Sequence, residues 1–137
     1  MERRQRIAYV RFTSCSGCQL TLLNAEESLP LLPALIEVVR CPLLSSAVDD
    51  GGPLDAVLIE GSVSRPAELT ELLELRRRTP LLIAIGACAI TGGINLLGGV
   101  ARWEDAAVVY GGSAAEKSVI LPQPLPHLVR VDFSVAG

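Results

Sequence analysis

Two cysteines three positions apart, Cys15 and Cys18, are the residues of this chain whose spacing most clearly points to chemistry. They follow a short apolar run at residues 7–12 and precede a leucine-rich stretch, so they lie on a turn between a predicted strand and a predicted helix. Both thiols can face one point from such a turn, and Gly17 between them lets the backbone approach a bound group closely. This pattern is typical of zinc sites, iron-sulfur sites and dithiol redox pairs.

The elements that must position these thiols alternate along the chain. Apolar runs predict strands at 7–12, 34–39, 55–60 and 81–85, and alternation of apolar and polar residues predicts another at 129–135. Helices are predicted at 20–29, ended by Pro30 and Pro33, at 66–78, and at 103–110. Loops are predicted at 45–53 and 86–93, and an extended proline-rich segment at 122–126. This alternation predicts a single α/β domain over residues 1–137, flavodoxin-like, with a mostly parallel sheet in the order 2-1-3-4-5.

The residues that could form a site follow the predicted strands. Cys15 and Cys18 come after the first strand, Glu60 ends the third, and Cys88 follows the fourth, just after Gly86. The carboxyl ends of parallel strands meet at one edge of a sheet, where such folds bind their ligands. We therefore predict that three thiols and one carboxylate share that edge.

Three thiols leave a metal centre incomplete, because structural zinc takes four protein ligands and a 4Fe-4S cluster takes one thiolate per iron. Cys41 ends the second strand, but Pro42 turns the chain away from the edge, so we interpret Cys41 as a buried spectator. The other candidate is a residue following Gly137, because the final strand leads to the same edge.

Composition narrows the class of protein. Half of the residues are hydrophobic and only 4% are aromatic, which is typical of aliphatic strands buried between helices. The net charge of −3 and the absence of a basic patch beyond residues 3–6 argue against nucleic acid as a partner. No apolar run reaches the roughly 18 residues of a membrane span. Four unevenly spaced cysteines do not form a secreted disulfide framework, so we expect a cytoplasmic protein with reduced thiols.

Three segments together resemble a known family: 15–20 (Cys-Ser-Gly-Cys-Gln-Leu), 59–62 (Ile-Glu-Gly-Ser), and 86–89 (Gly-Ala-Cys-Ala) with Gly92 and Gly93. They are similar to the small, electron-transferring subunit of nickel-iron hydrogenases, of the cytoplasmic sulfhydrogenase delta and non-F420-reducing types. A more distant resemblance is to the 20 kDa iron-sulfur subunit of NADH:quinone oxidoreductase. The resemblance covers nearly the whole chain, in order.

The resemblance implies a flavodoxin-like domain that binds a proximal 4Fe-4S cluster and relays electrons to or from a catalytic nickel-iron large subunit. It implies ligand roles for Cys15, Cys18 and Cys88. The family's fourth ligand lies in a Gly-Cys-Pro motif, which would begin at Gly137. The resemblance further implies additional electron-transfer subunits, and a large subunit covering the glycine-rich segment 92–99.

Beside an anionic cluster, Glu60 would be a proton relay at the subunit interface. The alternative is a strand-end carboxylate held by neighbouring amides. We interpret His127, in the proline-rich segment, as a surface residue and not a ligand.

Three other functions remain open from the residues alone. The cysteines could hold a structural zinc ion in an interaction domain. Cys15 and Cys18 could form a thioredoxin-like dithiol pair, with Cys88 incidental. A flavin-binding flavodoxin is the third, although two cysteines replace the hydroxyls and amides that its first loop would offer to a phosphate.

Overall fold

The structure, a computed structural model, describes residues 3–97 and 122–137. Its strands are β1 (Gln5–Arg11), β2 (Ile36–Arg40), β3 (Ala56–Glu60), β4 (Leu81–Ile85) and β5 (Phe133–Val135). Its helices are α1 (Gly17–Leu23), α2 (Leu32–Leu35), α3 (Pro66–Arg78), α4 (Gly86–Thr91) and α5 (Ile94–Leu97), with 3-10 turns η1 (Leu29–Leu31) and η2 (Leu125–His127). The helix predicted at 103–110 lies outside the described residues.

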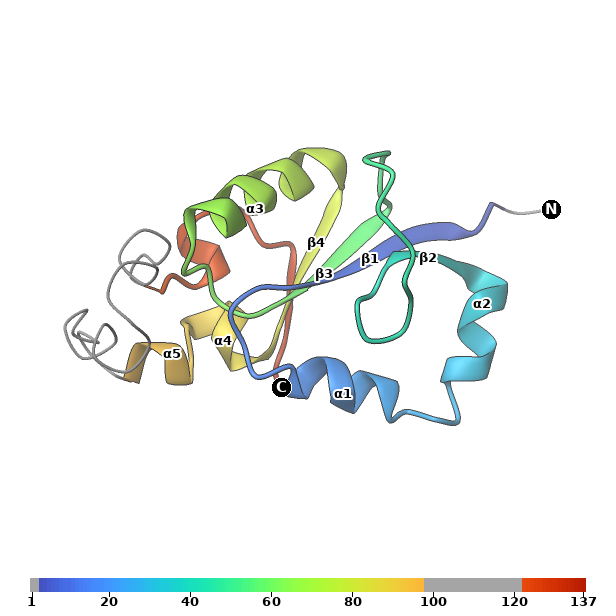
Figure 1. The fold of residues 1–137 in the computed structure, drawn as a ribbon, viewed down its shortest axis with the longest axis horizontal. Helices are drawn as coiled ribbons and strands as arrows, with labels where there is room; N and C mark the ends of the chain where they lie inside the picture. Colours follow the sequence, from blue (N-terminus) through green and yellow to red (C-terminus); the bar gives the residue numbers. More distant parts are fainter. Residues whose placement is uncertain (1–2, 98–121) are drawn as a thin grey trace.

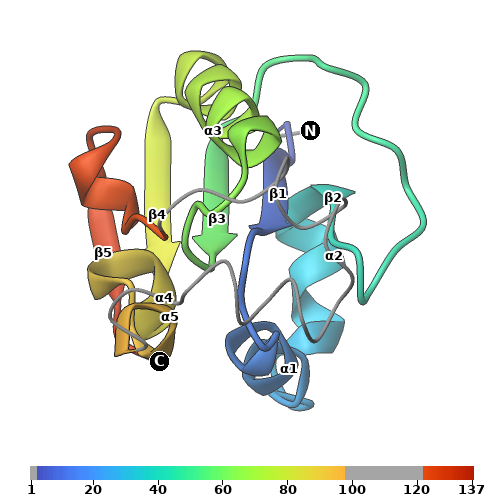
Figure 2. The same cartoon turned by 60° about the vertical axis from the view of Figure 1, so that its left-hand side comes forward.

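The described strands form one sheet in the order β2-β1-β3-β4-β5, and each neighbouring pair is parallel. This confirms the predicted flavodoxin-like α/β arrangement. Figure 1 shows α3 on one side of the sheet and α1 on the other. In Figure 2 the arrowheads of β3 and β4 point toward the end of the molecule where α1, α4, α5 and the C terminus lie.

The hydrophobic core lies where α3 packs on the centre of the sheet. Val57 and Ile59 of β3 and Leu72 of α3 are completely buried. β3 lies between β1 and β4 and is largely buried on both faces, which explains its continuous apolar sequence. The central strands therefore have fixed positions, and so do the residues at their carboxyl ends.

The start of α3 is the one predicted from local sequence. Pro66 occupies the first turn, where a missing amide proton costs nothing. Glu68 reaches back to accept hydrogen bonds from the amides of Ser64 at 2.9 Å and Arg65 at 3.1 Å. The helix ends at Arg78, which forms an ion pair with Asp49. Residues 45–53, which include Asp49, form no helix or strand, and this confirms the loop predicted there.

The first predicted helix, 20–29, is wrong at both ends. α1 begins three residues earlier, at Gly17, and ends at Leu23 with Asn24 as its C-cap. Pro30 and Pro33 do not end a helix. They stand in the first turns of η1 and α2, where proline is well tolerated, so α2 takes the first two residues of the strand predicted at 34–39.

The loop predicted at 86–93 is largely helical. α4 starts directly at the end of β4 and runs over Gly86–Thr91, and its C-cap Gly92 has a left-handed backbone, with φ 87°. The glycines at 86 and 92 therefore bound a one-and-a-half-turn helix, and Cys88 lies inside it.

The strand predicted at 129–135 is reduced to three exposed residues, and Phe133 is 64% exposed. Val129 and Val131 still pack against the core, but from irregular backbone. Asp132 explains the interruption: its Oδ2 accepts hydrogen bonds from the Leu82 amide at 2.8 Å and from an Arg76 guanidinium nitrogen at 2.6 Å. The Leu82 amide is thus taken by a side chain, while the Leu82 carbonyl still accepts a hydrogen bond from the Asp132 amide at 2.9 Å.

In the proline-rich segment, Gln123 forms an isolated antiparallel bridge with Val63, and η2 follows. His127 is exposed, as expected of a surface residue. Among residues 3–97 and 122–137, no helix has the length and hydrophobicity needed to cross a bilayer.

Candidate functional site

The sequence-predicted residues come from three neighbouring strand ends. Cys15 and Cys18 lie on the turn from β1 into α1, Glu60 is the last residue of β3, and Cys88 lies in the first turn of α4 after β4. Because β1, β3 and β4 are adjacent and parallel, all of these residues are at the carboxyl edge of the sheet. The topology thus places them where the alternation of elements predicted.

The loop between the two cysteines has an unusual backbone. Ser16 has φ 68° and is the one non-glycine residue with positive φ among the described residues. Its side chain is held by Arg11, whose Nη1 donates to Ser16 Oγ at 2.5 Å. The Gly17 amide donates to Cys15 Sγ at 3.4 Å. A residue with left-handed backbone turns the chain sharply between Cys15 and Cys18, so both cysteines lie in one tight turn.

The thiols of Cys18 and Cys88 are affected electrostatically by their neighbours. Partial burial raises the pKa of the Cys18 thiol, and negative charge on Glu60, Cys15 and Cys88 raises it further. Burial likewise raises the pKa of the Cys88 thiol, followed by charge on Cys15 and Glu60. The structure therefore brings Cys15, Cys18 and Cys88 into one electrostatic neighbourhood, and an electropositive group bound among them would favour the thiolate forms.

The backbone approaches the Cys18 sulfur closely at two glycines. A Cβ atom on Gly86 would overlap Cys18 Sγ, and Gly86 has φ 82°, a conformation that side chains rarely adopt. A Cβ atom on Gly137 would lie 2.9 Å from the same sulfur and 3.0 Å from Gly86 Cα. The end of the β5 segment thus reaches the cysteine edge, as predicted. Gly86 holds this position because a larger residue does not fit.

Glu60 is only 2% exposed and belongs to a buried hydrogen-bond network. Its Oε2 accepts from the Tyr9 hydroxyl at 3.0 Å and from the Gln19 amide at 3.1 Å. Burial, followed by the charge of Glu60, raises the pKa of Tyr9 far above 10, so its hydroxyl remains a donor. The Gln19 bond is the amide contact expected of a strand-end carboxylate.

Cys41 is the buried one among the four thiols. It is 4% exposed, and its Sγ accepts a hydrogen bond from Gln19 Nε2 at 3.1 Å. The other amide atom, Gln19 Oε1, is buried without a hydrogen-bond partner. The position of Cys41 in the interior matches the prediction of a buried spectator.

Sequence reasoning missed Tyr9, Arg11 and Gln19. Tyr9 and Arg11 are two residues apart on β1 and share one face of the strand, and β1 pairs with β3 so that Arg11 lies opposite Glu60. The alternation of side chains between the two faces of β1 could be predicted from the sequence. The register that brings Glu60 beside this face was not.

The described residues contain no preformed single-ion site: no three histidine, cysteine, aspartate or glutamate side chains are arranged to hold one metal ion. A tetrahedral zinc site would need its sulfurs within about 4 Å of one another, since Zn–S bonds are about 2.3 Å. A 4Fe-4S cluster distributes its thiolates over separate irons, one to each. Three thiols, with two glycines packed against one of them, fit the one-thiolate-per-iron pattern of a cluster better than a single ion.

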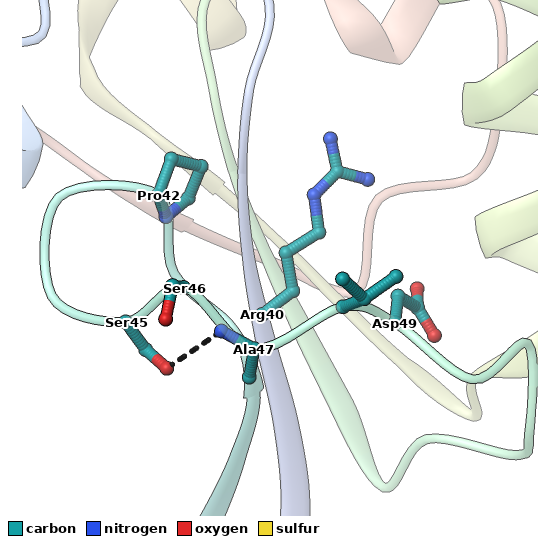
Figure 3. A pocket seen from close by; sticks show the side chains of 7 residues that line it. Arg40, Pro42, Ser45, Ser46, Ala47 and Asp49 are labelled. Carbon is teal, nitrogen blue, oxygen red and sulfur yellow. Dashed lines mark hydrogen bonds between the residues drawn. The ribbon is translucent and has the colours of Figure 1, made fainter.

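A separate cavity of about 330 Å³ lies in the segment 40–49 after β2, where Figure 3 shows Arg40 and Asp49. Arg40 pairs with Glu71, and the Ala47 amide donates to Ser45 Oγ at 3.0 Å, the dashed line in Figure 3. Its lining contains no thiol, imidazole or unpaired carboxylate among these residues, so we assign it no chemistry.

Comparisons with known proteins agree with this geometry. The family described as NADH ubiquinone oxidoreductase, 20 kDa subunit, matches residues 15–137. A subunit of the F420-non-reducing hydrogenase vhu of Methanococcus voltae is 30% identical over all of this chain and 52% of its own length. The sulfhydrogenase 2 subunit delta of Pyrococcus furiosus is 30% identical over 96% of this chain and 55% of its own. The chain thus spans about half the length of these relatives.

A solved structure extends the likeness to the backbone. A chain of an NAD+-reducing NiFe hydrogenase in the H2-reduced state superimposes with a TM-score of 0.84 at 28% identity, covering 98% of this chain and 83% of the other. Sequence and fold point to one group, and this chain belongs to the family of the 20 kDa NADH ubiquinone oxidoreductase subunit and the nickel-iron hydrogenase small subunits.

Proposed function

We propose that this chain is the electron-transfer subunit of a cytoplasmic nickel-iron hydrogenase-type complex and holds a proximal 4Fe-4S cluster. Cys15, Cys18 and Cys88 would each bind one iron, and a residue just after Gly137 would supply the fourth ligand. When bound, the cluster would supply one-electron transfer between the catalytic large subunit and further carriers. Bond-making chemistry is assigned to the partner, not to this chain.

The observation that carries this proposal is the meeting of three thiols from two separate segments at one edge of a parallel sheet, in a chain of this family. The charge of Cys15 raises the pKa of both the Cys18 and the Cys88 thiol, which supports their neighbourhood. The position of Gly137 against Cys18 supports a fourth ligand entering from the β5 segment. Gly86 lets the backbone approach the Cys18 sulfur at a point where a side chain would clash with it.

The chain's own residues orient and shield this site. Glu60 lies beside the thiols, and Tyr9 and the Gln19 amide hold its Oε2 in place. A buried carboxylate held by two donors beside the thiols is placed to pass a proton between neighbouring groups, which is the relay role that we propose for Glu60. Its burial restricts exchange of that proton with bulk water.

The catalytic partner would cover the cysteine edge. Ile94 and Leu97 of α5 are 72% and 81% exposed, directly after the segment that carries Cys88. Contiguous exposed apolar surface marks protein contacts, and these two side chains would contribute to such a surface beside the cysteine edge. We propose that this surface contacts the large subunit, and that other electron-transfer subunits complete the complex.

The experiment is anaerobic purification of the complete natural chain, followed by reconstitution with iron and sulfide. We expect a brown protein with about four irons and four acid-labile sulfides per chain, one cluster's complement. Cys15→Ser and Cys88→Ser should both lose the cluster. Cys41→Ser is the matched control and should keep it, because that thiol lies in the interior on Gln19.

Three outcomes would contradict the proposal. Colourless protein with stoichiometric zinc would indicate a structural zinc domain. Disulfide reductase activity that is lost in Cys15→Ser and kept in Cys88→Ser would indicate a dithiol enzyme. Failure of the loaded chain to capture a large catalytic subunit would contradict the proposed partner.

A further inference from the structure

Arg11 is the charged residue nearest in sequence to the cysteine loop, and it is bonded to it. It is the last residue of β1, and its guanidinium donates to Ser16 Oγ at 2.5 Å, between the two cysteines. Ser16 is 7% exposed and has the left-handed backbone described above. A residue other than glycine in that conformation costs about 1–2 kcal/mol, so the loop depends on contacts that hold it there.

Most other arginines of the described chain form an ion pair with a carboxylate, and Arg11 does not. In the part of the chain that the structure describes, six arginines have a carboxylate within 4.0 Å, namely Arg3, Arg6, Arg40, Arg76, Arg78 and Arg130. Arg11 has none within that distance among the same residues. Glu60 lies opposite it in the β1–β3 register, but the Glu60 carboxylate is bonded to Tyr9 and Gln19. The guanidinium is therefore directed to the cysteine loop itself.

We propose that Arg11 is a positioning and charge-tuning residue for the group held by Cys15 and Cys18. It anchors Ser16, which fixes the turn, and it places a permanent positive charge beside thiolate-bound iron. The guanidinium stays protonated at any physiological pH, so this charge is constant. A positive charge stabilises the reduced, more negative form of a cluster and raises its reduction potential. This inference rests on the proposed cluster-binding function.

Variants separate the charge from the hydrogen bond. Arg11→Gln keeps a donor and removes the charge, and Arg11→Lys keeps the charge. Ser16→Ala removes the acceptor and leaves the arginine. Arg77→Gln is the matched control, because Arg77 is exposed at the end of α3, and α3 ends at the opposite edge of the sheet, where Arg78 pairs with Asp49. The measurement is a redox titration of the reconstituted natural chain, followed by absorbance and electron paramagnetic resonance, with iron content determined in parallel.

In Arg11→Gln we expect the ratio of reduced to oxidised cluster, at a fixed applied potential, to fall about three- to tenfold, where tenfold corresponds to about 59 mV. Arg11→Lys should keep most of the ratio of the natural chain. The ratio in Ser16→Ala should lie between those of Arg11→Gln and Arg11→Lys. The change should shrink at high salt, because Arg11 is exposed and its charge is screened. Arg77→Gln should leave the ratio unchanged.

An iron-loaded Arg11→Gln protein with the same potential as the natural chain would overturn this inference and leave the proposed function intact. An equal shift in Arg77→Gln would also overturn it, because the effect would then be one of net charge. An unchanged potential with lost binding of the large subunit would make Arg11 an interface residue instead. A natural chain that takes up no iron would overturn the proposed function, and the tuning role with it.

Discussion

Replacing Gly86 with alanine tests the geometry of the cysteine edge directly. Gly86 joins β4 to α4 with φ 82°, and a Cβ atom there would overlap the sulfur of Cys18. Gly51 offers a matched control, because it has φ 75° and a Cβ atom there would meet nothing within 4 Å. The two substitutions therefore share the backbone strain and differ in the clash.

The magnitudes follow from these two contributions. An alanine in the left-handed region costs about 1–2 kcal/mol, and reduced freedom of the unfolded chain offsets about 0.4–1 kcal/mol of that. We expect Gly51→Ala to lower the free energy of unfolding by about 1 kcal/mol. Overpacking adds about 1–3 kcal/mol, so Gly86→Ala should lower it by about 2–4 kcal/mol. Rotation of the Cys18 side chain would relieve part of the clash but would displace the sulfur.

The assay is urea denaturation of the iron-free protein, with iron uptake measured separately. The double variant Gly86→Ala/Cys18→Ala removes the clashing sulfur, so its destabilisation should be smaller than the sum of the two single effects by about 1–3 kcal/mol. Equal destabilisation by Gly86→Ala and Gly51→Ala, together with additive behaviour of the double variant, would refute the close packing of Gly86 on Cys18.

Two further predictions concern buried polar groups. Tyr9→Phe should lower the free energy of unfolding by about 1–3 kcal/mol, because buried Glu60 loses a donor; unchanged urea midpoints would contradict this. Folding raises the pKa of Tyr9 above its ordinary value of 10.0, so the stabilisation that the Tyr9 hydroxyl provides is complete below pH 10 and is lost as the pH rises further. Tyr9→Phe should therefore show a smaller loss of stability in alkaline unfolding curves. Asp49→Asn should cost about 1–3 kcal/mol by breaking the partly buried pair with Arg78. That pair lowers the pKa of Asp49, so the stabilisation it provides is present above pH 3.8 and is lost as the pH falls. An acid unfolding transition that is identical in Asp49→Asn and the unmodified protein would refute this.

Local sequence rules predicted those elements whose signals are local. The bounds of α3 followed from Pro66, Glu68 and the basic final turn, and β4 from an unbroken apolar run. They failed at α4, because Gly86 and Gly92 were interpreted as a loop when they are the boundaries of a helix. They also failed at β5, where the Asp132 side chain takes the Leu82 amide and the strand begins only at Phe133.

The sequence by itself determined the alternation of strands and helices, and with it the edge of a parallel sheet at which Cys15, Cys18 and Cys88 lie, whereas the sheet order was predicted as the commonest one for a domain of this length. These features follow from hydrophobic periodicity and from the chirality of parallel connections, which act over short stretches of chain. Tertiary structure alone decided that Tyr9 and the Gln19 amide hold Glu60 and that Gly86 packs on Cys18. Those contacts depend on strand register and helix placement, which the packing of the whole molecule determines.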